Sequence, residues 1–211
     1  MKKYFGTLAL VAGLAFQGSA HADIFNGDFS AGFSGWSGQV DYLDDYDAAA
    51  MDAVTTPDFF TLTSFATLTD AARLSTHYDP QTGSGWAVSL FQTFTMPSLS
   101  QPTNRLWLEF DLFFSMDDPA GGDSWLAQLT DQSGSGLAPV DLTAVSLPYE
   151  VTAFAGLDVE LLFSIENIAG NDDSLVIDNL RITEEVVDPI PAPSTLALVG
   201  LTLLFWRRKL I

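Results

Sequence analysis

The sequence contains no cysteine, which excludes disulfides, thiolate metal sites and a cysteine nucleophile. It has only two histidines, His21 and His77. No lysine occurs between Lys3 and Lys209, which removes Schiff-base and P-loop chemistry from that part of the chain. The groups left for chemistry or binding are mainly carboxylates, hydroxyls, amides and aromatic rings.

Positive charge is scarce as well. The chain has 27 acidic residues against 8 basic ones, and its formal net charge is -19. Apart from the terminal segments 2–3 and 207–209, the only basic residues are Arg73, Arg105 and Arg181. Binding to phosphate chains needs clustered lysine and arginine, so nucleic acid is excluded as a partner. The acidity suits solubility outside the cell and attracts divalent cations.

The first residues have the layout of a secretory signal peptide. Two lysines form a charged start, an apolar stretch of about a dozen residues follows, and Ala20 and Ala22 provide an A-x-A cleavage site. The alternative, a buried core helix, would leave the charges and the alanine pair as coincidences. We therefore predict a signal peptide over residues 1–22 and a mature, exported chain that begins at Asp23.

Residues 186–211 form a proline-rich linker, an apolar segment from Thr195 to Trp206 and a basic end. An apolar helix of about a dozen residues reaches roughly 18 Å, which is short of the ~30 Å hydrocarbon core. An ordinary short anchor is the alternative, because basic residues can snorkel and the bilayer can thin locally. The shortness favours a transient membrane anchor over a permanent one.

The same tail carries the motif Pro191-Ala192-Pro193 before its apolar segment and Arg207-Arg208 after it. It resembles the PEP-CTERM sorting signal, in which Pro-Glu-Pro precedes a short apolar helix and an arginine-rich cluster; Ala192 stands in the glutamate position. The resemblance implies recognition by an exosortase-type enzyme, cleavage near the motif and transient anchoring in the inner membrane. It also implies delivery to the cell surface or extracellular matrix of a Gram-negative bacterium.

Between the two ends, residues 23–185 show the period-two alternation of β-strands, separated by glycine, proline, aspartate and serine clusters. The alternating segments are 87–96, 106–114, 125–129, 159–165 and a last strand at 174–182. No helical stripe of normal length is present, and 46–54 is the only weak candidate. Short strands at turn-marked intervals predict an all-β domain built as an antiparallel β-sandwich.

Five short pieces of this domain occur in a familiar order, at 26–29, 35–36, 91–94, 153–156 and 177–180. Together they resemble the jelly-roll type of carbohydrate-binding module. The resemblance implies a jelly-roll-like sandwich in which the first and last strands lie side by side. That arrangement would bring the turn at 26–28 close to Asp178.

The same resemblance implies a structural calcium ion. Calcium prefers about six to eight oxygen ligands, and the implied ligands are Asp28 and Asp178, with Asn26 contributing its amide or backbone oxygen. The equal alternative is that Asp28 forms a turn and Asp178 makes a strand-end hydrogen bond.

Two other acidic runs are weaker candidates for cation binding. The run 41–47 fails as an EF-hand loop, because Tyr46 takes the glycine position and Asp52 the final glutamate position; a solvated acidic loop is favoured over weak cation binding. The run 171–173 is interpreted as a solvated hairpin turn.

Glu109 and Asp111 fit the first two positions of the E-x-D-x-x-E signature of laminarinase-like glycosidases, but Phe114 occupies the third. A retaining mechanism needs a pair of carboxyl groups across the scissile bond. We therefore interpret both residues as the solvent face of a strand and predict that the protein is not an enzyme; glycosidase activity ranks a distant third among the functions.

Sugar binding is the main alternative activity, because aromatic rings stack on the apolar faces of pyranoses. Trp107 and Trp125 are the candidate rings, and Trp107 lies on the strand face opposite Leu106 and Leu108. A core position is the competing interpretation for each. We predict an exported, non-enzymatic protein of the cell surface or polysaccharide matrix, with binding of an extracellular polysaccharide as the alternative.

Overall fold

A computed structural model describes residues 24–42, 59–76, 85–116, 122–143, 147–168 and 172–187. The predicted signal peptide, the sorting motif with its basic end, the weak helix candidate at 46–54 and His77 lie outside these residues. Among the described residues, no helix is both long enough and apolar enough to cross a membrane.

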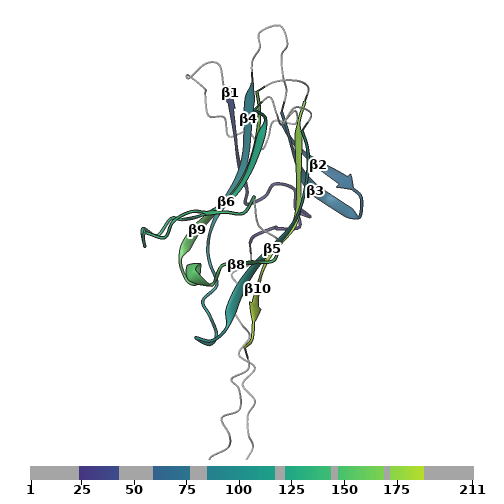
Figure 1. Ribbon diagram of the computed structural model, residues 1–211. Coiled ribbons are helices and arrows are strands. Elements are labelled where there is room, and N and C mark those ends of the chain that lie inside the picture. Colours follow the sequence, from purple (N-terminus) through teal and green to yellow (C-terminus); the bar gives the residue numbers. More distant parts are fainter. Residues whose placement is uncertain are drawn as a thin grey trace, which may run out of the picture.

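Two five-stranded antiparallel sheets face each other (Figure 1). Sheet A has the order β1 (Ser37–Tyr42), β4 (Trp86–Thr95), β9 (Asp158–Asn167), β6 (Ser124–Asp131), β7 (Val140–Asp141). Sheet B has the order β2 (Phe60–Phe65), β3 (Leu68–Ser75), β10 (Ser174–Glu185), β5 (Arg105–Ser115), β8 (Tyr149–Glu150). The only helix in the described residues is a short 3-10 turn, η1 (Thr152–Phe154). The predicted all-β sandwich is confirmed.

The order of the strands is that of a jelly roll. From β3 to β6, each strand lies in the opposite sheet from the one before it. The returning strands then fill the gaps: β9 lies between β4 and β6, and β10 lies between β3 and β5. This wrapping is the double Greek key of an eight-stranded jelly roll, with β1 and β2 added at one edge of each sheet. The jelly-roll-like fold is therefore confirmed.

The core lies between the sheets and follows the alternation of the sequence. On β9, Val159, Leu161, Phe163 and Ile165 are fully buried. The ring of Phe163 meets Phe110 of β5 edge-on, with the ring centroids 5.3 Å apart. Successive side chains of a strand point to opposite faces, so the apolar positions mark the buried face directly.

One end of β5 departs from this pattern. Leu106 and Leu108 are buried, but Phe114 is 53% exposed although it has the same parity. Its ring stacks on Trp125 of β6, with centroids 5.3 Å apart and an interplanar angle of 27°. Rings from the two sheets thus pack on each other at the end of the strands.

The expectation that the first and last strands are neighbours is wrong. β1 pairs with β4 in sheet A, whereas β10 pairs with β3 and β5 in sheet B. The reason is the β2–β3 hairpin, which was not among the predicted strands: β3 takes the place beside β10, and β2 forms the edge of the sheet beyond β3. The loop before β1 does reach β10, because Leu180 donates its backbone N–H to the carbonyl of Gly27 at 3.0 Å.

Candidate functional site

The face of sheet B that points away from the core, here called the outer face of sheet B, collects polar and aromatic side chains. Directly opposite one another across β10 and β5 stand Asp178 and Asp111, Arg181 and Glu109, and Thr183 and Trp107. All three arginines of the described residues belong to this face: Arg73 lies opposite Val176, and Arg105 opposite Glu185. The face therefore combines charges of both signs with aromatic rings.

A β-bulge shapes the middle of this face. The register of β10 against β5 shifts between Asp178 and Arg181, and Asn179 within the shift has a left-handed backbone with φ 55°. Asparagine tolerates this conformation better than most residues, and an extra residue re-aims nearby side chains. Here it directs the Asn179 amide to Asp111, whose Oδ2 accepts a hydrogen bond of 2.8 Å from Nδ2.

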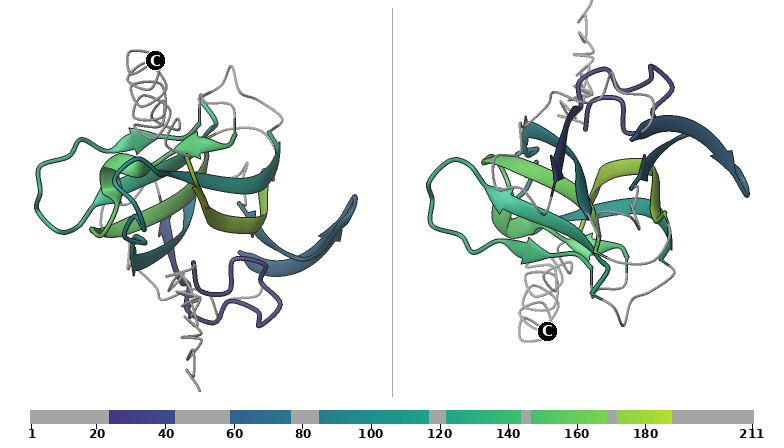
Figure 2. Two further views of the ribbon diagram at one scale, coloured as in Figure 1. Left: turned by 90° about the horizontal axis from the view of Figure 1, so that it is seen from below. Right: turned by 90° about the horizontal axis from the view of Figure 1, so that it is seen from above.

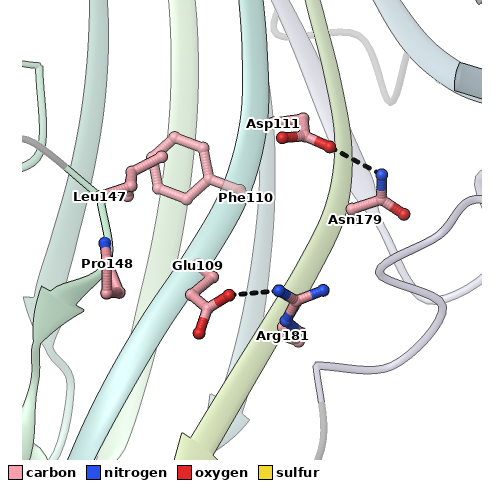
Figure 3. A pocket seen from close by; sticks show the side chains of 7 residues that line it. All are labelled: Glu109, Phe110, Asp111, Leu147, Pro148, Asn179 and Arg181. Atoms are coloured by element: carbon pink, nitrogen blue, oxygen red, sulfur yellow. Dashed lines mark hydrogen bonds and ion pairs between the residues drawn. The ribbon is translucent and has the colours of Figure 1, made fainter. Parts of the chain in front are cut away.

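A cavity of about 180 Å³ lies beside the bulge (Figure 3). In the figure, Glu109 points toward Arg181 and Asp111 toward Asn179, while Leu147 lies on the other side. The lining residues come from β5, β10 and the segment before β8: Glu109, Phe110, Asp111, Leu147, Pro148, Asn179 and Arg181. One wall is therefore polar and the other apolar.

The polar wall of the cavity carries hydrogen-bonding atoms that have no partner among the described residues. Glu109 forms an ion pair with Arg181 and accepts a bond of 3.4 Å from the Thr183 hydroxyl. Within the described residues, no hydrogen bond engages Oδ1 of Asp111 or Oδ1 of Asn179, and only one nitrogen of Arg181 is used. The cavity thus offers free acceptors and free N–H donors side by side.

Aromatic rings stand on the same face of β5 on both sides of the polar residues. Trp107 is half-buried, and its Nε1 donates to Oε2 of Glu185 at 2.8 Å, which fixes the plane of the ring. Phe113 is 40% exposed and lies 5.2 Å from Phe65 of the β2–β3 hairpin, centroid to centroid. Trp107 and Phe113 are six positions apart along the strand, which is roughly 20 Å.

The other tryptophans lie elsewhere. Trp36 is buried in the core, and Trp86 packs against Phe59 with centroids 5.3 Å apart. Trp125 belongs to sheet A and stacks on Phe114, so the structure does not bring the two candidate rings, Trp107 and Trp125, onto one face.

The predicted calcium ligands are placed near each other but are engaged in other bonds. Asn26 uses its amide within its own loop, accepting from the N–H of Ala31 at 3.0 Å and donating to the carbonyl of Gly32 at 2.6 Å. Oδ1 of Asp28 accepts from both the N–H and the hydroxyl of Ser30, at 3.2 and 2.9 Å. Oδ1 of Asp178 accepts from the N–H of Asn179 at 2.7 Å.

These are the turn and strand hydrogen bonds that the alternative interpretation expects. Within the described ranges, no group of three or more histidine, cysteine, aspartate or glutamate side chains is arranged to hold a metal ion. The calcium ion stays a prediction.

The pKa values of Asp28 and Asp178 are shifted in opposite directions. The hydrogen bonds from Ser30 hold the pKa of the exposed Asp28 below its ordinary value of 3.8. Burial raises the pKa of Asp178 above 3.8, and the charges of Asp111, Asp28 and Asp70 raise it further, although the bond from Asn179 works against them. Since Asp178 faces Asp111 directly and is only 3% exposed, its charge costs stability.

We expect Asp178→Asn to raise the free energy of unfolding at pH 7 by roughly 0.5–1 kcal/mol, because it removes one of two like charges that stand opposite each other. The raised pKa means that the folded protein holds this proton more tightly than the unfolded one, so the penalty grows as pH rises from 3.8 through the raised value. Denaturation between pH 3 and pH 7 should show the advantage of the variant vanishing in acid.

Asp28→Asn provides the control of opposite sign. The lowered pKa of Asp28 means that its stabilisation is present above 3.8 and is lost as pH falls. This variant should therefore be less stable than the wild type at neutral pH and equal to it in acid. If both substitutions raised the stability at neutral pH, the cause would be the lower net negative charge of the chain and not the local environment of each aspartate.

The likeness of this chain to known proteins is limited. No protein-family model matches the chain, and no curated protein matches it. Among solved structures, the carbohydrate-binding module TmCBM61 in complex with beta-1,4-galactotriose is similar over 77% of this chain and 97% of that chain, with a TM-score of 0.40 and 14% sequence identity. The jelly-roll assignment itself rests on the strand order of this chain.

Proposed function

We propose that the outer face of sheet B binds an extracellular polysaccharide and that the protein acts without catalysis. The observation that carries the proposal is the cavity beside the β10 bulge, where open acceptors on Asp111 and Asn179 adjoin the free N–H groups of Arg181. Neighbouring sugar hydroxyls both donate and accept hydrogen bonds, so a wall with both kinds of partner matches them.

The aromatic rings supply the second half of such a site. Trp107 and Phe113 face outward on either side of the cavity residues of β5, and aromatic rings pack on the apolar faces of sugars. Their separation of roughly 20 Å along the strand suits a stretch of polysaccharide better than a single sugar.

The same geometry supports binding over hydrolysis. In the incomplete glycosidase signature, Glu109 is paired with Arg181, and one oxygen of Asp111 accepts a hydrogen bond from Asn179. The third position of the signature holds Phe114, which stacks on Trp125 in place of providing a second catalytic carboxyl group. The proposal therefore keeps the protein in the non-enzymatic class.

We further propose that the chain is exported and sorted as its ends indicate. A signal peptide over residues 1–22 and the Pro191-Ala192-Pro193 motif with Arg207-Arg208 support recognition by an exosortase-type enzyme, with transient anchoring in the inner membrane. Mass spectrometry of surface-localised protein should lack peptides from residues 195–211. Their presence there would contradict cleavage of the tail.

Trp107→Ala should weaken polysaccharide binding tenfold or more, because a buried aromatic contact of this kind contributes about 2 kcal/mol. Affinity electrophoresis against a panel of polysaccharides identifies the ligand, and calorimetry measures the loss. Trp125→Ala makes the same chemical change in sheet A and should leave binding within twofold, with the melting temperature of each variant recorded. Equal losses in the two variants would reject the outer face of sheet B as the site.

Calcium can be tested in the same preparation. If Asp28, Asp178 and Asn26 hold a structural ion, calcium should raise the melting temperature of the wild type and leave that of Asp178→Asn unchanged. A melting temperature of the wild type that does not respond to calcium would reject the prediction.

A further inference from the structure

We infer that the outer face of sheet B selects neutral, hydroxyl-rich polysaccharides and rejects those that carry carboxylate or sulfate groups. This inference rests on the proposed function and defines the ligand class of the same site.

The cations near the cavity are already neutralised. Arg181 pairs with Glu109 in the cavity wall, and Arg105 pairs with Glu150 at 3.5 Å. Arg73 is the remaining arginine of the described residues, and it lies opposite Val176 on β3, on the other side of β10 from β5. An anionic sugar at the cavity would therefore meet no unpaired guanidinium group.

The carboxylates at the same place are not neutralised in this way. Asp111 receives its hydrogen bond from the uncharged amide of Asn179, and Asp178 receives one from the backbone N–H of Asn179. These two carboxylates stand directly opposite each other on β5 and β10, and burial of Asp178 reduces the screening of its charge by water. The raised pKa of Asp178, in which burial comes first and the charge of Asp111 contributes, agrees with this local excess of negative charge.

The hydrogen-bonding groups lead to the same ligand class. A neutral sugar can donate its O–H groups to the free Oδ1 atoms of Asp111 and Asn179, and bonds to an ionised acceptor are the stronger kind. An ionised sugar carboxylate offers acceptors only. Placed against Asp111, it would leave Oδ1 of Asp111 and the sugar oxygen that faces it without a donor, and it would add like-charge repulsion.

The test uses the full chain and matched ligands. Affinity electrophoresis at low ionic strength compares neutral galactan, xylan, glucan and mannan with alginate, polygalacturonate and a sulfated galactan. The neutral polysaccharide that binds best is then oxidised at C6, which converts its primary alcohols to carboxylates on an unchanged backbone. We expect oxidation to weaken binding about tenfold at low salt and added salt to recover part of the loss.

A pair of variants assigns the effect to the cavity. Asp111→Asn should reduce the discrimination between the two forms at least threefold, because it removes the nearest exposed carboxylate and keeps an acceptor in place. Asp158→Asn makes the same change on an exposed aspartate of β9 in sheet A and should leave the discrimination unchanged.

The outcomes separate the two proposals. Tighter binding of an anionic polysaccharide, or oxidation without effect, would overturn the selectivity and leave polysaccharide binding standing. Binding to no member of the panel would overturn the proposed function and this inference with it. Discrimination that Asp111→Asn and Asp158→Asn reduce equally would show that the net charge of the chain, and not this site, rejects anions.

Discussion

Replacing Gln92 with methionine should lower the free energy of unfolding by roughly 3 kcal/mol, because three backbone groups would lose the hydrogen-bond partner that this buried side chain gives them. Gln92 is buried on the inward face of β4, at 4% exposure. Its Oε1 accepts from the N–H of Phe25 at 2.9 Å, and its Nε2 donates to the carbonyls of Phe25 and Gly35 at 2.9 and 3.0 Å. Methionine has a side chain of similar length but can form none of these bonds, so the loop before β1 would lose its three hydrogen bonds to the Gln92 side chain of β4.

Chemical denaturation at pH 7 measures this loss, and Gln128→Met is the matched control. Gln128 lies half-buried on β6, where its Oε1 accepts only a weak bond of 3.3 Å from Thr130. The control should change stability by less than about 0.5 kcal/mol. Similar losses in both variants would show that the three bonds of Gln92 do not hold the loop.

Gly27→Ala should be about as costly, at roughly 3 kcal/mol, for a steric reason. A Cβ atom at this position would lie 2.2 Å from the carbonyl oxygen of Leu180, which is backbone and cannot swing aside. Either the loop or β10 must move, and the bond from the Leu180 N–H to the Gly27 carbonyl would be strained or broken. Since Leu180 follows Asn179 in the bulge, polysaccharide binding should fall together with stability.

Gly134→Ala is the control that distinguishes a steric clash of the added Cβ atom from strain in the backbone conformation. Gly134 has φ +75°, and a Cβ atom added there would have no neighbour within 4 Å, so alanine meets only the left-handed strain of about 1–2 kcal/mol. Denaturation and calorimetry should show this smaller loss with binding intact. A Gly27→Ala variant as stable as the wild type would mean that the loop and β10 do not pack as closely as described.

The strands of the core could be predicted because burial on one face leaves a regular signature. Val159, Leu161, Phe163 and Ile165 alternate without interruption, and all four are fully buried. The β2–β3 hairpin was missed for the converse reason: on β2, Phe60 is buried but Leu62 and Phe65 are exposed, so the edge of the sheet imposes little alternation. Which strands become neighbours depends on that hairpin, and the pairing of β1 was predicted wrongly as a result.

Only part of the candidate site could be predicted from the sequence. The outward position of Trp107 followed from its parity against Leu106 and Leu108, whereas Asn179 and Arg181 were given no role. A signal for them does exist, since the core-facing residues of β10 are spaced by two, three and two positions: Leu175, Ile177, Leu180 and Ile182. That break in the period marks the bulge, but the residues it faces on β5 are about 70 positions away in the chain.

The position of β10 in sheet B also determines when the protein can fold. β3 and β5 each pair with β10 and not with each other (Figure 2), so the last strand of the described residues is the one that joins the rest of its sheet. Contacts between residues so distant in sequence form slowly, and a chain that ends before Ser174 should lack the strand that joins the β2–β3 hairpin to β5. For a protein exported as we propose, this order keeps sheet B incomplete, and the chain able to pass through a translocation pore, until β10 has been synthesised.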